Sequence, residues 1–158
     1  MVPAGLDGSP DDIDPQRVEA RHTRPMRNFP DHGMELTHIL VVEDLDRAKA
    51  FYRDVLGADL QREYGGTSTV LRFLGSWLLL VTAGEPTDDK PDVTFEPPVD
   101  LERVSHSMTI RVPSCQAAYA TLRERGAVFL TPPVTSPREV RAFFRDPDGH
   151  LLEISEAR

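Results

Sequence analysis

The sequence contains a single cysteine, Cys115, among its 158 residues. One thiol cannot form an internal disulfide, and it cannot supply a cysteine zinc cluster. Aromatic residues make up only 7% of the chain, and the densest apolar run, Trp77 to Val81, is far too short to span a membrane. The N-terminus has no apolar segment of the kind found in secretion signals. We therefore expect a cytoplasmic protein with no membrane partner.

An excess of positive charge is also missing. The chain has 18 Lys and Arg residues against 26 Asp and Glu residues, which gives a net charge of −8. A broad nucleic-acid surface needs the opposite balance, so we expect no nucleic-acid partner. The contents of 39% hydrophobic and 28% charged residues are ordinary for a globular protein, and the length suits one domain or two small halves that share a core.

Residues 1–33 differ from the rest of the chain. They are rich in Asp and Arg, they contain Pro3, Pro10, Pro15, Pro25 and Pro30, and their apolar residues follow no period. Such a segment buries too little apolar surface to offset the entropy of ordering it. We predict a disordered N-terminal tail over residues 1–33.

The remaining sequence shows one pattern twice. A strand-like run, 37–42, is followed by a helix that Asp44 caps and Gly57 ends, and a second run from Ser107 is followed by a helix that Ser114 caps and Gly126 ends. Three further strand-like runs follow each helix: 59–64, 68–74 and 77–82 in the first half, and 127–130, 140–145 and 151–155 in the second. The repeat predicts two βαβββ modules, 34–82 and 104–158, joined by a proline-rich connector, 83–103.

Two segments carry a resemblance to a known family. They are Asp44–Gly57 (DLDRAKAFYRDVLG) and Phe143–Glu153 (FFRDPDGHLLE). With the repeat, they resemble the glyoxalase, bleomycin-resistance and extradiol-dioxygenase (vicinal oxygen chelate) superfamily over about residues 36–156. The resemblance implies an α+β fold whose two modules form an open, cavity-enclosing sheet with the helices outside. It also implies a homodimer and a small-molecule ligand or substrate in the cavity.

Many members of that superfamily hold a divalent metal with two His and one or two Glu side chains. His38, His106 and Glu153 are the candidate ligands here, and such a set suits Fe, Mn, Ni or Zn. The family's strand histidine lies seven residues before the helix cap, a spacing that Thr37 and Ser107 fulfil. Because side chains on a strand alternate between faces, a histidine displaced by one residue faces away from the cavity. The metal question therefore stays open at this point.

The polar residues of the second half offer another use for the cavity. If the Asp146–His150 loop closes a hairpin, Glu153 lies opposite Phe143, with Arg141 and Arg145 diagonal to it on the same face. Two interpretations follow: the cavity recognises an anionic or polar small molecule, or an arginine neutralises a buried Glu153. We expect Glu153 to be the catalytic residue. The predicted ligand-binding residues are Thr37, Trp77, Ser107, Thr109, Arg111, Arg141, Phe143 and Arg145.

Two main functions fit these observations, and a third possibility is a pure interaction module whose cavity is filled by side chains. The first is a small-molecule-binding protein that acts by sequestration or by metal-independent chemistry. The second is a metal-dependent enzyme, either a lyase or isomerase of glyoxalase type or a ring-cleaving dioxygenase, in which Glu153 would bind the metal or relay a proton. A half-open sheet leaves strand edges that need cover, which is the physical reason for expecting a homodimer.

The tail interpretation makes a direct prediction. Deletion of residues 1–33, so that the chain begins at Met34, should leave the circular dichroism spectrum and the thermal unfolding midpoint nearly unchanged, because the tail lacks the periodicity of a packed element. Thermal unfolding of the full-length and shortened proteins tests this. Loss of cooperative unfolding after the deletion would show that the tail packs against the modules.

Overall fold

The computed structural model describes residues 29–30 and 32–158, and the part from Glu35 to Arg158 forms one compact unit. The chain up to Met34 is a separate unit, and the tail predicted over 1–33 lies almost entirely outside the described residues. In the described part of the chain, no helix is long and apolar enough to cross a membrane.

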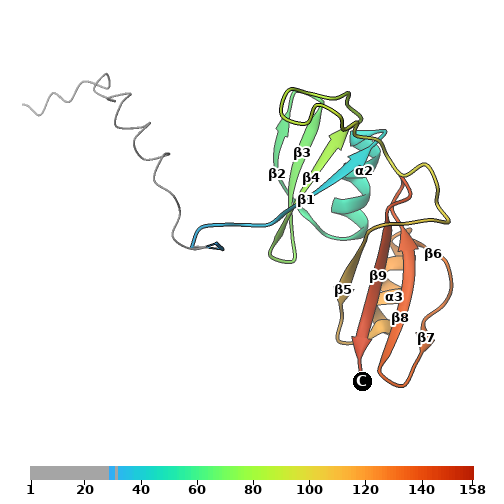
Figure 1. Ribbon diagram of the computed structural model, residues 1–158. Coiled ribbons are helices and arrows are strands. Elements are labelled where there is room, and N and C mark those ends of the chain that lie inside the picture. Colours follow the sequence, from blue (N-terminus) through green and yellow to red (C-terminus); the bar gives the residue numbers. More distant parts are fainter. Residues whose placement is uncertain (1–28, 31) are drawn as a thin grey trace, which may run out of the picture. The chain divides into compact units, whose positions relative to one another are not determined.

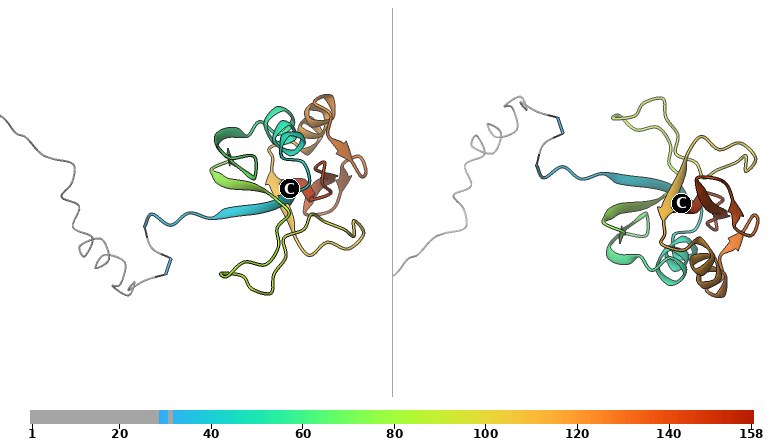
Figure 2. Two further views of the ribbon diagram at one scale, coloured as in Figure 1. Left: turned by 90° about the horizontal axis from the view of Figure 1, so that it is seen from above. Right: turned by 90° about the horizontal axis from the view of Figure 1, so that it is seen from below.

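The compact unit contains the predicted repeat, with a sheet and a helix in each half (Figure 1). Figure 2 shows both helices on one side of this unit and the connector on the other. The first half consists of β1 (Thr37–Val42), α2 (Leu45–Ala50), η1 (Phe51–Val55), β2 (Asp59–Tyr64), β3 (Ser68–Phe73) and β4 (Ser76–Thr82). The second consists of β5 (Ser107–Arg111), α3 (Cys115–Glu124), β6 (Val128–Phe129), β7 (Val134–Thr135), β8 (Glu139–Arg145) and β9 (Leu151–Ala157).

The two sheets have the same topology. The first has the strand order β1-β4-β3-β2 and the second the order β5-β9-β8-β6. In each sheet the opening strand pairs in parallel with the closing strand, β1 with β4 and β5 with β9, and the other pairs are antiparallel. The α+β class and the duplicated module are therefore confirmed. Both β1 and β5 are edge strands within the described sheets, so each keeps one side without a hydrogen-bonded neighbour strand.

The first helix differs from the prediction in its second turn. The sequence predicts one regular helix over about 44–56, and its start is as expected because the Asp44 side chain accepts a hydrogen bond from the Arg47 amide at 3.0 Å. From Phe51 onward the chain forms a π-helical turn, in which Leu56 N donates to Phe51 O at 3.2 Å. A π-turn adds one residue to the helix turn and so shifts the side chains that follow.

The strand predicted over 127–130, at the edge of the second sheet, also differs from the prediction. Instead of one strand over 127–130, two short pieces, β6 and β7, pair with successive parts of β8. Pro132 and Pro133 lie between them. Proline has no amide hydrogen to donate to a ladder, and for this reason the edge strand is interrupted there.

A buried hydrogen-bond network joins the two halves. The Tyr52 hydroxyl, from the first half, donates to Asp146 Oδ2 at 2.8 Å, while Asp146 Oδ1 accepts the backbone amides of Asp148 and His150 at 3.0 and 2.8 Å. Burial raises the pKa of the Asp146 carboxyl, and the His150 charge and the Tyr52 hydrogen bond oppose that rise. The predicted hairpin loop is thus confirmed, and it also docks onto the first half.

The rest of that loop makes two further contacts with the first half. His150 Nε2 lies 2.8 Å from the carbonyl oxygen of Val41, so this ring nitrogen donates there. Asp148 Oδ1 accepts from the Glu43 amide at 2.8 Å and pairs with Arg47 at 3.1 Å. The hairpin of the second half therefore satisfies backbone groups at the end of β1 and at the start of α2.

The Tyr52–Asp146 contact predicts a pH-dependent stability. Burial, followed by the nearby Asp146 charge, raises the pKa of the Tyr52 hydroxyl well above its usual value. The neutral hydroxyl therefore stabilises the fold fully below the unfolded tyrosine pKa of about 10, and this stability is lost as the pH rises further. Tyr52→Phe should lower the free energy of unfolding at pH 7 by about 1–3 kcal/mol, because Asp146 loses its buried donor.

Urea unfolding at pH 7 and at alkaline pH provides the measurement. Tyr52→Phe should lose less of its stability on going to alkaline pH than the wild type does. Tyr64→Phe is the matched control, since Tyr64 is 48% exposed. Equal stability of Tyr52→Phe and the wild type at pH 7 would contradict this account of the joined halves.

Candidate functional site

Each sheet has one face covered by a helix and one face turned away from it, which we call its trough face. In β1 the helix-side residues Leu40 and Val42 are buried, whereas Thr37 and Ile39 are exposed on the trough face. In β5, Met108 and Ile110 pack against the core, whereas Ser107, Thr109 and Arg111 alternate with them and are exposed. The strand phase predicted from spacing and alternation is therefore confirmed.

The trough face of the first sheet carries a cavity of about 480 Å³. Trp77 forms its aromatic wall and is held in place, because its Nε1 donates to Glu35 Oε2 at 2.7 Å. The Arg72 guanidinium lies 4.4 Å from the Trp77 ring centroid and 3.4 Å from Glu35 Oε1. The other lining residues are Thr37, Tyr64, Ser68, Val70 and Leu79. A fixed indole beside apolar and hydroxyl groups suits a flat, largely apolar ligand.

The trough face of the second sheet centres on Glu153, whose residue exposure is only 9%. Glu153 pairs with Phe143 across β8 and β9, as the sequence predicted. Its Oε2 accepts the Thr109 hydroxyl at 2.6 Å, and its Oε1 lies 3.8 Å from Arg141 Nη1. A hydroxyl and a half-exposed guanidinium thus compensate a nearly buried carboxylate.

Sequence reasoning missed Glu139, which organises the polar groups next to Glu153. Its Oε2 accepts the Ser155 hydroxyl at 2.9 Å and its Oε1 accepts from Arg141 at 3.3 Å. Ser155 Oγ in turn accepts from Arg111 Nη1 at 2.8 Å. The alternation of β8 contains a signal for this residue, because Glu139 lies two positions from Arg141 and therefore on the same face.

Two of the predicted arginine roles differ in the structure. Arg145 does not pair with Glu153; it donates to the carbonyl oxygens of Gly149, at 2.9 Å, and Leu101. Arg145 therefore fastens the connector to the hairpin loop. Arg111 turns to Ser155 and Glu139 rather than to Glu153. Arg141 alone of the three predicted arginines lies beside Glu153, and its guanidinium is 5.6 Å from the Phe143 ring centroid.

Neither histidine lies on the trough-face phase of a strand: His38 has the helix-side phase of β1, and His106 lies outside β5 and is exposed. His38 pairs with Leu78, a buried helix-side residue, and His106 directly precedes Ser107 at the start of β5. The two ring centroids are 6.3 Å apart. In the part of the chain that the structure describes, no group of three His, Cys, Asp or Glu side chains is placed to hold a metal ion. His38, His106 and Glu153 therefore do not form a donor set that fits the predicted divalent metal.

The structure is that of a two-module α+β protein with ligand-sized recesses. Each βαβββ module has a helix on one face of its sheet. The other face carries an aromatic wall in one module and a carboxylate in the other. The chain belongs to the Glyoxalase/Bleomycin resistance protein/Dioxygenase superfamily, whose family model matches residues 18–154.

Several solved structures share this fold. A glyoxalase/bleomycin resistance protein/dioxygenase from Nocardioides is 23% identical with a TM-score of 0.65, and the match covers 90% of this chain and 91% of that one. Lactoylglutathione lyase from Agrobacterium tumefaciens is 19% identical with a TM-score of 0.60, covering 80% and 95%. The fosfomycin resistance protein FosX from Listeria monocytogenes, in a mutant complexed with Mn(II) and a dihydroxypropylphosphonic acid, is 18% identical with a TM-score of 0.57, covering 78% and 89%. At these identities, the likeness shows the fold alone.

The Thr109–Glu153 bond makes a specific prediction. Thr109→Val should lower the free energy of unfolding by about 1–3 kcal/mol, because it leaves a nearly buried carboxylate oxygen without its donor. Thr37→Val is the matched control on the corresponding strand of the first half, since the Thr37 hydroxyl has no hydrogen bond among the described residues. Denaturant unfolding of both variants is the measurement. Equal losses in the two would show that the Thr109 hydroxyl does not stabilise Glu153.

Proposed function

We propose that this protein binds a small molecule on its trough faces and acts by sequestration or by metal-independent chemistry. The observation that carries the proposal is the environment of Glu153. Thr109 and Arg141 hold it on the trough face, while His38 lies on the opposite strand phase and His106 lies outside β5. A carboxylate already compensated in this way positions polar ligand groups without needing a metal.

The chemistry of the trough faces supports an aryl ligand with a polar or anionic group. Trp77 supplies a fixed aromatic wall on the first sheet. On the second sheet, the side chains of Arg111 and Arg141 are 68% and 50% exposed, so both retain donors for an anion. If the bound molecule is transformed as well as held, Glu153 is the group in position to accept or return a proton.

The proposal includes a cytoplasmic homodimer. The free edges of β1 and β5, together with Ile39 at 49% exposure on the first trough face, leave apolar and backbone surface that a second copy would cover. Such pairing would also add walls to trough faces that are open in the single chain. The cavity on the first sheet supports this part of the proposal, because the strands of that sheet line it on one side and leave the other side for a second copy.

The alternative function is a metal-dependent lyase, isomerase or ring-cleaving dioxygenase. The FosX complex with Mn(II), a protein of the same fold, favours it, as does a carboxylate on the last strand, Glu153. Against it stand the helix-side phase of His38 and the place of His106 outside β5, since a ligand set with Glu153 would require both rings on the trough face.

Metal analysis separates the two functions. Protein purified without chelator should contain no stoichiometric Fe, Mn, Ni or Zn by mass spectrometry, and His38→Ala and His106→Ala should leave the metal content unchanged. Stoichiometric metal that disappears in either histidine variant would overturn the proposal in favour of the metalloenzyme.

Ligand binding is followed through Trp77, the one tryptophan of the chain. Titration with 3-phenylpropionate should quench its fluorescence equally with and without EDTA. Arg141→Gln and Glu153→Gln should change the affinity, because both alter the charge beside the ligand. Arg123→Gln, on α3, serves as the control. Identical affinities in all of these proteins would count against the trough faces as the ligand site.

A further inference from the structure

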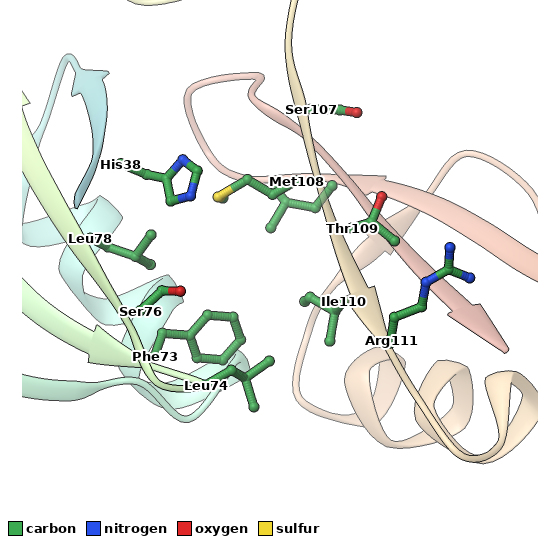
Figure 3. A pocket seen from close by; sticks show the side chains of 11 residues that line it. His38, Phe73, Leu74, Ser76, Leu78, Ser107, Met108, Thr109, Ile110 and Arg111 are labelled. Atoms are coloured by element: carbon green, nitrogen blue, oxygen red, sulfur yellow. The ribbon is translucent and has the colours of Figure 1, made fainter. Parts of the chain in front are cut away.

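A second cavity, of about 530 Å³, lies between the two halves of the compact unit, along β5 (Figure 3). One wall comes from the β3–β4 turn and β4, and the other from β5 and β9. Its apolar wall consists of Phe73, Leu74, Leu78, Met108, Ile110 and Leu152. Met108, Ile110 and Leu78 belong to the helix-side phase of their strands, whereas Ser107, Thr109 and Arg111, on the trough face of β5, also line this cavity. It shares no lining residue with the cavity on the trough face of the first sheet.

The β3–β4 turn contributes an unusual residue to this cavity. Leu74 and Gly75 form a two-residue turn with φ values of +47° and +79°. A turn of this kind favours Asn or Asp before glycine, and leucine in the left-handed region is strained. Leu74 is nevertheless there, 72% exposed, at the wall of the cavity. Strain at an exposed apolar residue is explained if a ligand covers it.

The charge of the cavity is the opposite of the charge of the protein. The chain has a net charge of −8, yet none of the described residues that line the cavity has a carboxylate, and Arg111 contributes a guanidinium to the lining. One end is marked by the His38 ring, with the His106 ring 6.3 Å away, and the Ser76 hydroxyl lies on the same wall as His38. Within the described residues, neither the His38 ring nor the Ser76 hydroxyl has a hydrogen-bond partner.

We propose that this inter-half cavity is a second binding site, for an aliphatic carboxylic acid whose chain lies along Met108 and Ile110 and whose carboxylate meets His38. Cavities of about 300–1,000 Å³ are typical for small ligands, and the apolar part of the lining is aliphatic apart from Phe73. The polar part consists of His38, Ser76, Ser107, Thr109 and Arg111. The imidazoles of His38 and His106 donate hydrogen bonds to an anion, and the absence of lining carboxylates leaves no repulsion against it. The site differs from the trough cavity of the first sheet both in position and in the aliphatic class of its ligand, and it borders the second trough face at Ser107, Thr109 and Arg111.

Decanoate is the probe. Titration of the ¹⁵N-labelled full-length protein should give saturable shifts of the amide signals of Phe73–Ser76 and Ser107–Arg111. Amides of the trough cavity, such as Val70 and Leu79, should be unaffected. Shifts confined to the trough cavity, or the absence of saturable binding, would overturn the proposal.

Two variants test the walls. Leu74→Asn removes the apolar side chain but places a favourable residue in the turn, so the fold should remain as stable as the wild type or become more stable. It should weaken decanoate binding about fivefold or more, the loss expected for an aliphatic contact. His38→Phe keeps a ring of similar shape but no donor and should weaken binding by about threefold to tenfold.

Ile39→Thr is the matched control, since it removes an exposed apolar side chain from the trough face of β1. It should leave decanoate affinity unchanged. Equal weakening in Ile39→Thr and Leu74→Asn would overturn the assignment of the site. So would light scattering in which Leu74→Asn converts a dimer to a monomer, because a second copy would then be what covers Leu74. The response of Trp77 to 3-phenylpropionate tests the trough cavity of the first sheet, which shares no lining residue with this site, so the two proposals can fail independently.

Discussion

The buried carboxylate of Asp146 is the constraint on which the arrangement of the two halves depends. One oxygen closes the hairpin loop of the second half through two backbone amides, and the other accepts the Tyr52 hydroxyl of the first half. Because the same side chain shapes the loop and docks it, the geometry of the loop and the placement of the halves cannot vary separately. The cavity between β5 and the β3–β4 turn exists only at that placement.

The two trough faces show how one fold provides different surfaces from the same strand order. The first sheet presents an indole fixed between Glu35 and Arg72. The second presents carboxylates that hydroxyl and guanidinium groups hold in place, with Glu153 nearly buried and Glu139 at the edge of the network. Alternation along each strand keeps these polar groups off the helix-side core. Changes on the trough faces can therefore alter ligand recognition with little effect on core packing.

Much of the fold follows from local signals in the sequence. Asp44 and Ser114 cap their helices as the spacing predicts, and Gly149, with φ of +95°, ends the Asp146–His150 loop. The faces of Thr109, Glu153 and His38 followed from counting residues, since strand phase is local. The interruption of the last edge strand was also visible in principle, because Pro132 and Pro133 cannot continue a ladder.

Other features were out of reach of the sequence because they depend on contacts between distant residues. Tyr52 has the spacing of an ordinary core residue, and only the fold shows that its hydroxyl meets Asp146. The partner of Arg145 is the carbonyl of Leu101, in a connector without periodicity. The π-helical turn at Phe51–Val55 has no marker residue in the sequence.

That π-helical turn links chain length to the joining of the halves. Tyr52 lies within the turn, and each residue of a regular α-helix rotates the side chain direction by roughly 100°. In a chain one residue shorter between Ala50 and Gly57, with an ordinary helix there, the next aromatic or apolar side chain would point in a different direction relative to Asp146. The extra residue therefore changes the direction in which the side chains point, rather than the distance that the helix spans. Single-residue insertions and deletions in this helix would reorient one module against the other while leaving each module's own strands intact.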